Sequence, residues 1–391
     1  MDRRYGSSSR RPRRGPATRA AAAAAGVASC VLAAALVSGC GESQPGASAQ
    51  TFQTGSPGTA SLLPGVTGTT SPSGFGTPSG SGSPSGSATP SGSATPSGTA
   101  SPGAGALTAS DAPFALPTAV TGATAVADDG RMLVLGGEDG GGRPTNQVTS
   151  VDPSSGMATS AGTLSKPVTD AAATIVNGTP TVFGGSSGSG KATDVVQTFS
   201  GGTSQEVGKL PAPRENHGAA TANGKTYLVG GDDGTTTQGD ILATSDGATF
   251  QNVGKLATPV RNPAVATTGS GSDQKVTVFG GEAANGPTDA IQQFDPATGQ
   301  TSTVGKLPAD LRDASAFTLN GSTYLAGGES GGQAATKIYK FDPSDNSVTE
   351  AGDLPAGVEN AAAATAGDNA YLAGGKVKDK VSNSVTQLTA K

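Results

Sequence analysis

The sequence predicts an all-β fold built from six repeated units of four strands each. Six Gly-Gly doublets, each closing a short apolar run, follow one another at intervals of 48, 46, 50, 47 and 47 residues. The doublets are Gly136-Gly137, Gly184-Gly185, Gly230-Gly231, Gly280-Gly281, Gly327-Gly328 and Gly374-Gly375. A period near fifty residues with a glycine pair after a strand is typical of a four-stranded propeller blade. We therefore expect a six-bladed β-propeller.

The first two strands of each unit are predicted to form a hairpin. The apolar runs that end at the doublets lie at 131–135, 179–183, 225–229, 275–279, 322–326 and 369–373. Upstream of them lie stretches of small residues, such as 171–176 and 314–319. Asn-Gly or Asp-Gly dipeptides, including Asn223-Gly224, join most of these segments and favour tight hairpin turns.

The third and fourth strands follow a polar loop after each doublet. The third strand ends in Asp-Pro in three units, at Asp152-Pro153, Asp295-Pro296 and Asp342-Pro343. Aspartate caps such a turn, and proline presets its φ angle. The fourth strand carries a recurrent Val-Gly-Lys-Leu phrase at 207–210, 253–256 and 304–307. Four strands in a fixed order complete each blade.

The two ends of the repeat region fit a closed ring. The region begins with Phe114-Ala115-Leu116-Pro117, which resembles the fourth-strand phrase, and it ends with a third strand at 384–389. The last blade therefore lacks a fourth strand of its own. We expect the N-terminal segment to supply that strand, because the pairing would remove two open sheet edges.

Together these residues resemble the kelch repeat over residues 112–391. The resemblance rests on the Gly-Gly doublets, the Asp-Pro turns, the Leu-Pro phrase before an Arg, and a second-strand tyrosine at Tyr227, Tyr324 and Tyr371. It implies a kelch-type propeller. The kelch pattern places a Trp in the fourth strand, whereas this chain has no Trp. Smaller contacts between blades are the expected consequence.

Residues 1–39 have the features of an export signal. Seven Arg precede residue 20, residues 20–39 are almost all apolar, and Val37-Ser38-Gly39-Cys40 resembles the bacterial lipobox. The resemblance implies a lipid on Cys40 that anchors the protein to the outer face of the cytoplasmic membrane. The alternatives are an ordinary signal peptide that is cleaved without lipidation and an uncleaved anchor, since about 18 apolar residues can just span a bilayer.

Residues 40–111 are predicted to be a disordered linker. They consist mainly of Ser, Gly, Thr, Pro and Ala, and a segment of this composition has too few apolar side chains to form a core. We expect the linker to tether the propeller, residues 112–391, at a distance from the membrane.

Charge and composition exclude several classes of function. Without residues 1–39, 18 basic and 29 acidic residues remain, a net charge of −11, which makes nucleic acid an unsuitable partner. The two cysteines, Cys30 and Cys40, precede the propeller, so no disulfide is expected in it. With one histidine and no residues at metal-ligand spacing, the propeller is expected to bind no metal or cofactor. We expect a monomer.

The resemblance to kelch propellers also implies a ligand-binding face. In such rings the loops from fourth to first strand and from second to third strand lie on one face. The predicted ligand-binding residues on these loops are Arg214, Asn216, His217, Arg261, Asn262, Arg312, Asp313 and Asn360.

A structural interpretation competes with ligand binding for the charged members of this set. The two loops of one blade carry opposite charges, as though they formed ion pairs. The predicted pairs are Arg214 with Asp232, Arg261 with Glu282, Arg312 with Glu329, and the reversed pair Glu359 with Lys376. The binding hypothesis then rests on the remaining residues, which are Asn216, His217, Asn262, Asp313 and Asn360.

Two functions remain open. The first is an extracytoplasmic binding or scaffold module whose partner is a protein or a glycan. The second is an enzyme like the kelch-type sugar mutarotases and epimerases, in which His217 or Glu215 would move the proton. The binding loops contain no aromatic residue, which disfavours stacking on a sugar ring.

Overall fold

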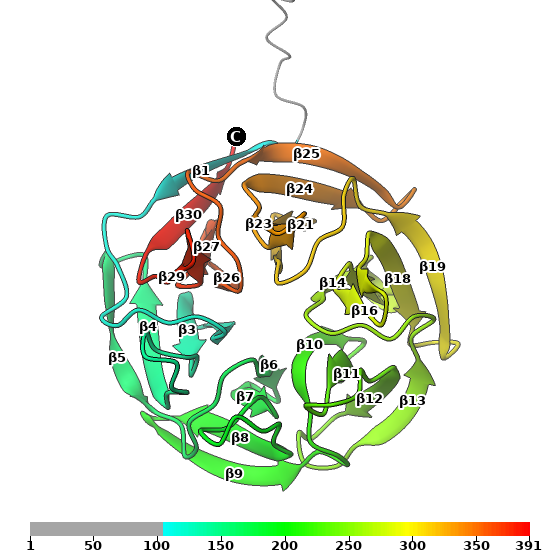
Figure 1. Ribbon diagram of the computed structural model, residues 1–391, viewed down its shortest axis with the longest axis horizontal. Coiled ribbons are helices and arrows are strands. Elements are labelled where there is room, and N and C mark those ends of the chain that lie inside the picture. The colour runs from blue at the N-terminus through cyan, green and yellow to red at the C-terminus, as the bar shows by residue number, and fades with distance from the viewer. Residues whose placement is uncertain (1–104) are drawn as a thin grey trace, which may run out of the picture. The chain divides into compact units, whose positions relative to one another are not determined.

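The computed structural model describes residues 105–391, which form a ring of six antiparallel sheets around a central channel (Figure 1). The prediction of an all-β, six-bladed propeller is confirmed. Residues 1–39, Cys40 and almost all of the predicted linker lie outside the described residues. Within residues 105–391, no helix has the length and apolar character needed to cross a bilayer.

Each of the first three blades is a four-stranded sheet whose strands follow in chain order from the channel outwards. Blade 1 contains β2 (Thr124–Asp128), β3 (Arg131–Leu135), β4 (Gln147–Asp152) and β5 (Met157–Thr163). Blade 2 contains β6 (Ala172–Val176), β7 (Thr179–Phe183), β8 (Val195–Ser200) and β9 (Thr203–Lys209). Blade 3 contains β10 (Glu215–Ala222), β11 (Lys225–Asp232), β12 (Asp240–Thr244) and β13 (Gln251–Lys255).

The other three blades add a short two-stranded hairpin between their second and third strands. Blade 4 contains β14 (Ala264–Thr268), β15 (Lys275–Phe279), β18 (Ala290–Asp295) and β19 (Gln300–Lys306). Blade 5 contains β20 (Ser315–Leu319), β21 (Ser322–Ala326), β24 (Lys337–Asp342) and β25 (Ser347–Asp353). Blade 6 contains β26 (Ala362–Ala366), β27 (Asn369–Ala373), β30 (Val385–Ala390) and β1 (Leu107–Asp111). The hairpins are β16 (Glu282–Ala283) with β17 (Gly286–Pro287), β22 (Glu329–Ser330) with β23 (Gln333–Ala334), and β28 (Lys376–Val377) with β29 (Lys380–Val381), and a 3-10 turn, η1 (Gly271–Asp273), precedes β15.

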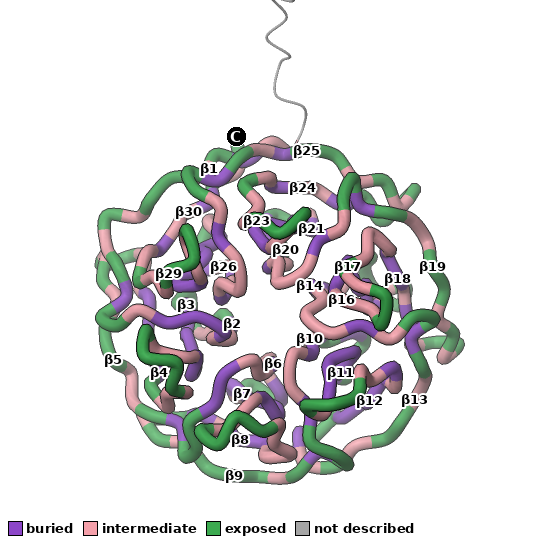
Figure 2. The backbone as a smooth tube through the Cα atoms, viewed as in Figure 1, coloured by how far each residue is buried: buried purple, intermediate pink, exposed green. Residues whose placement is uncertain are grey.

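The local signals in the sequence correspond to the backbone conformations observed. Asn223 and Gly224, which join β10 to β11, both have positive φ angles, 49° and 74°. A two-residue hairpin turn with two positive φ angles matches the twist of the strands that it connects. Figure 2 shows the second and third strands buried between neighbouring sheets and the outermost strands exposed.

The Gly-Gly doublets join each blade to its neighbour. The second glycine of each doublet donates its N–H to a carbonyl in the loop that enters the next blade, as Gly281 does to Leu311 over 2.8 Å. A Cβ on Gly280 would collide with that same carbonyl, and both glycines have positive φ. The bond recurs six times, and the one from Gly375 to Val120 joins blade 6 to blade 1. Glycine is therefore required by the contact between blades.

Aromatic pairs occupy part of the space between blades in a chain without tryptophan. Phe341 of blade 5 packs edge-on against Phe279 of blade 4 with ring centroids 5.1 Å apart. Phe294 of blade 4 packs against Tyr227 of blade 3 with the rings tilted by 54° and their centroids 5.5 Å apart. Such pairs add about 0.5–1.5 kcal/mol to the free energy of burying their surface.

The N-terminal segment closes the ring, as predicted, but with a different strand. β1 pairs with β30 in antiparallel register from Leu107 opposite Ala390 to Asp111 opposite Thr386. The expected strand at 114–117 is not part of this ladder, because Pro113 has no N–H to donate. Leu116 is buried and donates its N–H to the carbonyl of Asn383. In each of the other blades the leucine that follows the fourth strand makes the equivalent hydrogen bond. The propeller thus begins at or before Leu107, inside the segment predicted to be linker.

We expect the stability of the ring to depend on this clasp. Leu107→Ala should lower the free energy of unfolding by about 2–5 kcal/mol, because it leaves a cavity between blades 5 and 6. Thr108→Ala, an exposed change on the same strand, should have little effect. A chain that begins at residue 112 should associate through the free edge of β30. Urea unfolding and light scattering measure both effects, and equal stability of the two substituted proteins would contradict the clasp.

Candidate functional site

The channel mouth is formed by one residue of each blade, which lies two positions before the innermost strand or, in blade 3, is the second residue of that strand. All six have a left-handed backbone, with φ between 53° and 62°. We call them the inner ring, and they are Gly122, Asp170, Asn216, Asn262, Asp313 and Asn360. Gly, Asn and Asp are the residues that adopt this conformation at the least energetic cost.

The backbone of the inner ring closes on itself. Each member donates its N–H to the carbonyl of the member in the preceding blade, over distances of 2.8–3.1 Å. The bond from Gly122 to Asn360 completes the circle between blades 1 and 6. Six hydrogen bonds therefore hold the mouth of the channel at a fixed diameter and fix the direction in which each side chain leaves the backbone.

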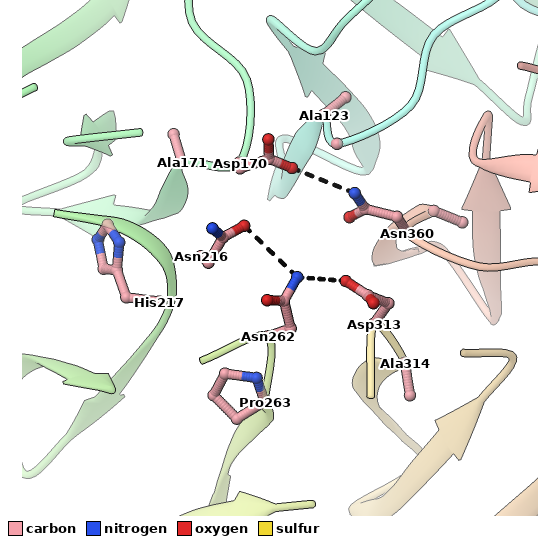
Figure 3. A pocket seen from close by; sticks show the side chains of 12 residues that line it. Ala123, Asp170, Ala171, Asn216, His217, Asn262, Pro263, Asp313, Ala314 and Asn360 are labelled. Atoms are coloured by element: carbon pink, nitrogen blue, oxygen red, sulfur yellow. Dashed lines mark hydrogen bonds between the residues drawn. The ribbon is translucent and has the colours of Figure 1, made fainter. Parts of the chain in front are cut away.

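The side chains of the ring interact with one another, as Figure 3 shows. The amide of Asn262 donates to the carboxylate of Asp313 and to Oδ1 of Asn216, the latter over 3.4 Å. The amide of Asn360 donates to Oδ1 of Asp170 over 3.1 Å. In the backbone ring Gly122 stands between these two residues. A Cβ on Gly122 would collide with the side chains of Thr169 and Asp170. Glycine in blade 1 thus makes room for the Asp170 carboxylate.

The inner ring encloses a cavity of about 90 Å³ at the channel mouth. The residue after each ring position also lines it, and these are mostly alanine. Two further cavities continue the channel along the innermost strands, with walls of alanine and, at the far end, threonine. Charged and amide side chains therefore gather at one end of the channel.

Burial raises the pKa of both carboxyl groups in the ring. The pKa of Asp170 is raised chiefly by burial, and hydrogen bonds from Asn360 and Thr169 oppose the shift. Burial also raises the pKa of Asp313, against the hydrogen bond from Asn262, and the charge of Asp170 raises it further. The two residues belong to blades 2 and 5, which lie opposite each other in the ring (Figure 1). Like charges thus face each other across the mouth.

Two of the four predicted ion pairs are confirmed outside the ring. Arg261 pairs with Glu282 at 2.9 Å, and Arg312 pairs with Glu329 at 2.8 Å. Arg312 also reaches Glu282 at 3.0 Å, so the three contacts form a continuous chain from blade 4 to blade 5. The hydrogen bond from Arg261 lowers the pKa of Glu282. Partly exposed pairs of this kind contribute about 0–1 kcal/mol each.

The predicted pair of Arg214 with Asp232 is wrong. Arg214 is buried and donates to Asp240 at 2.6 Å, at a position that valine occupies in blades 2 and 4. The residue opposite Asp232 in the strand register is Glu215. Arg214 therefore belongs to the packing of blade 3 and lies outside the inner ring.

The predicted ion pair of Glu359 with Lys376 is wrong, and the two residues are joined only through the backbone. Two hydrogen bonds of 3.1 and 2.8 Å join their main chains. Within residues 105–391, no ion pair of 4.0 Å or less forms between the two side chains.

His217 follows the inner ring in blade 3 but is closed off from solvent. Its side chain is 7% exposed, and neither ring nitrogen has a hydrogen-bond partner within residues 105–391. Burial, helped by the nearby charge of Arg214, lowers its pKa to about 3. The imidazole is therefore neutral at neutral pH and packs close to Gly184 of blade 2. Blades 2 and 5 have Ala171 and Ala314 at the same position.

Of the predicted binding residues, the structure brings four into the inner ring, namely Asn216, Asn262, Asp313 and Asn360. Arg261 and Arg312 lie beside the ring in the ion-pair chain. The sequence analysis missed Asp170 and Gly122. The sequence does contain a signal for Asp170, because Thr169-Asp170-Ala171 occupies the same place in its repeat as Arg312-Asp313-Ala314. No group of three or more His, Cys, Asp or Glu within residues 105–391 has a geometry that could hold a metal ion.

No protein-family model matches the sequence, and no curated protein is similar to it.

The lowered pKa of His217 predicts a loss of stability in mild acid. In the unfolded chain a histidine titrates near pH 6.5, whereas the folded protein resists protonation down to about pH 3. Below pH 6.5 the unfolded state therefore binds the extra proton, and stability falls by about 1.4 kcal/mol per pH unit. His217→Ala, which installs the residue of blades 2 and 5, should remove this slope between pH 6.5 and 4.5. Urea unfolding across that range measures it, and identical slopes in both proteins would refute the burial of a neutral imidazole.

Proposed function

We propose that this protein is a kelch-like binding or scaffold module, held outside the cytoplasmic membrane by a lipid on Cys40. The leader sequence supports export, and the lipobox-like residues before Cys40 support the anchor. The six-bladed propeller is consistent with a binding module, since propellers present loops from every blade on one face. The kelch relationship rests on the Gly-Gly, Asp-Pro and Leu-Pro phrases of the repeats.

The observation that carries the binding function is the inner ring. Four Asx side chains of the predicted set, joined by Asp170, converge on one cavity from five different blades. Their backbone is fixed by six hydrogen bonds, so little conformational entropy remains to be lost on binding. Polar groups that converge on a preformed concave site are the usual features of a ligand site.

The geometry does not favour the alternative, a sugar mutarotase or epimerase. That chemistry needs a group able to gain and lose a proton in contact with the sugar. Both nitrogens of His217 are buried and its pKa is about 3, so it is not a proton donor at neutral pH. Glu215, whose pKa burial raises, is not among the residues that line the inner-ring cavity. Binding without turnover is therefore the function that we propose.

Cys40→Ala tests the anchor. We expect the native protein to incorporate a labelled fatty acid and the substituted protein to incorporate none, because the thiol that carries the lipid is lost. Immunoprecipitation after growth with the labelled fatty acid measures the incorporation. A native protein that carries no label but sediments with the membrane would show instead that residues 20–39 are retained as an uncleaved anchor.

The binding face is tested by removing ring side chains without disturbing the ring backbone. Glycine adopts positive φ freely, so Asn216→Gly, Asn262→Gly and Asn360→Gly together should preserve the fold and remove three amides. The matched control changes Thr267, Thr318 and Thr365, on the innermost strands away from the inner ring, to alanine. After incubation with cell-envelope extract, we expect one component to be retained by the native and control proteins and lost from the glycine variant.

Thermal unfolding must show that both variants are folded. A component retained equally by all three proteins would place binding away from the inner ring. If no component is retained by any of them, the protein is a scaffold without a ligand at this face.

A further inference from the structure

The inner ring offers hydrogen-bond acceptors to a ligand and few donors. The amide groups of Asn262, Asn360 and Asn216 already donate to Asp313, Asp170 and Asp232, respectively. By contrast, Oδ1 of Asn262 and Oδ1 of Asn360 accept no hydrogen bond from residues 105–391. A carboxylate has no donor, and its two oxygens can accept about four hydrogen bonds. The cavity is thus lined by an excess of lone pairs.

The negative charge in the ring lacks compensation. Within residues 105–391, no basic side chain lies within 4.0 Å of Asp170, and Asp313 has only the Nε atom of Arg312, at that limit. The guanidinium nitrogens Nη1 and Nη2 of Arg312 are already bound to Glu282 and Glu329. A positively charged ligand would therefore find one carboxylate, Asp170, with no cation of the described residues within 4.0 Å, and a second, Asp313, whose single cation is shared with Glu282 and Glu329.

The repeats show that this charge is not required by the fold. Asn216, Asn262 and Asn360 have the same left-handed conformation and the same place in the backbone ring as Asp170 and Asp313. Asparagine would fit both positions without a buried charge. Burial raises the pKa of each aspartate, which means that the ionised form is disfavoured by its surroundings. Ionisable groups that lower the stability of the fold and lie in a concave site are typical of functional sites.

The cavity is large enough for a small cationic group. A cavity needs about 10–15 Å³ to hold one water molecule, so about 90 Å³ holds several. That space accommodates an ammonium group with the carbon that bears it. The ligand group can be the end of a chain or a substituent that projects from a larger molecule.

We propose that the inner-ring cavity binds a primary ammonium group, with Asp170 and Asp313 as the charged acceptors and the amide oxygens of Asn262 and Asn360 as neutral ones. An ammonium has three donors, a positive charge and no acceptor, which complements this lining. The group can come from a lysine side chain or from an amino sugar. This inference rests on the binding function proposed above and names its ligand class.

The first experiment uses the mature protein, beginning at Cys40 without lipid, and follows the side-chain amide NMR signals of Asn262 and Asn360. Methylammonium chloride should shift these signals in a saturable manner. Tetramethylammonium chloride at the same ionic strength carries the charge but no N–H donor, and it should leave them in place. Equal shifts with both salts would show a general salt effect and would overturn the proposal.

Matched substitutions locate the site. Asp170→Asn and Asp313→Asn should each weaken methylammonium binding at least tenfold, since a charged hydrogen bond contributes about 1.5–3 kcal/mol. Both proteins should be as stable as the native protein or more so. Asp379→Asn makes the same change at an exposed residue with φ of 61°, on the β28–β29 hairpin, and should alter binding less than twofold. Unchanged binding in both ring variants would overturn the assignment.

Two further probes distinguish the sources of the ammonium group. Lysine amide with an acetylated α-amine represents a peptide side chain, and glucosamine represents an amino sugar. Acetylation of the remaining amine in either probe should abolish its binding. If no amine binds while the envelope component is still retained through the ring, the ammonium assignment fails and the binding function stands. If amines bind but no envelope component is retained, the cavity binds the group without a macromolecular partner.

Discussion

The closure of the ring by backbone hydrogen bonds between blades is the constraint on which the other features depend. One set runs from the Gly-Gly doublets to the next blade, and a second set runs through the inner ring. Both need positive φ angles, which restrict the doublets to glycine and the inner ring to Gly, Asn or Asp. The fold itself therefore places short polar side chains at the channel mouth. The choice between Asn and Asp at each position carries the information about function.

Much of the fold could be predicted because it is encoded in residues that determine the local backbone. Doublets, Asn-Gly turns and Asp-Pro turns gave the number of blades and the strand order. Pairing across the chain was harder to predict, because an offset of one residue changes which side chains meet. The sequence predicts that Arg214 is equivalent to Arg261, but Glu215 occupies the position in blade 3 that Arg261 has in blade 4. Arg214 instead forms an ion pair with Asp240, 26 residues later. The closing strand was misplaced because Pro113 interrupts the ladder after β1.

Blade 3 illustrates why a lone histidine is a poor guide to an active site. Arg214 and His217 occupy positions where blade 2 has Val168 and Ala171, so this blade carries two polar side chains inside its packing. The arginine is compensated by Asp240, whereas the imidazole has no partner within the described residues. An unpartnered neutral group reduces stability. The rarity of histidine in this sequence suggests a catalytic role for His217. The burial of both ring nitrogens shows that proton transfer from His217 to a ligand is not available.

The rigidity of the inner ring has a consequence for recognition. Because each ring residue is held through its backbone to both neighbours, Asp170 and Asp313 cannot separate by a shift of the main chain. In a flexible loop such a shift could carry the two carboxylates apart. In the closed ring both stay at the mouth, where burial is the chief cause of their raised pKa values and the charge of Asp170 adds to the shift of Asp313. A cation that enters the mouth therefore meets the electrostatic field of carboxylates that are already in place, and the protein does not have to rearrange to bind it. This is the property expected of a preorganised binding site.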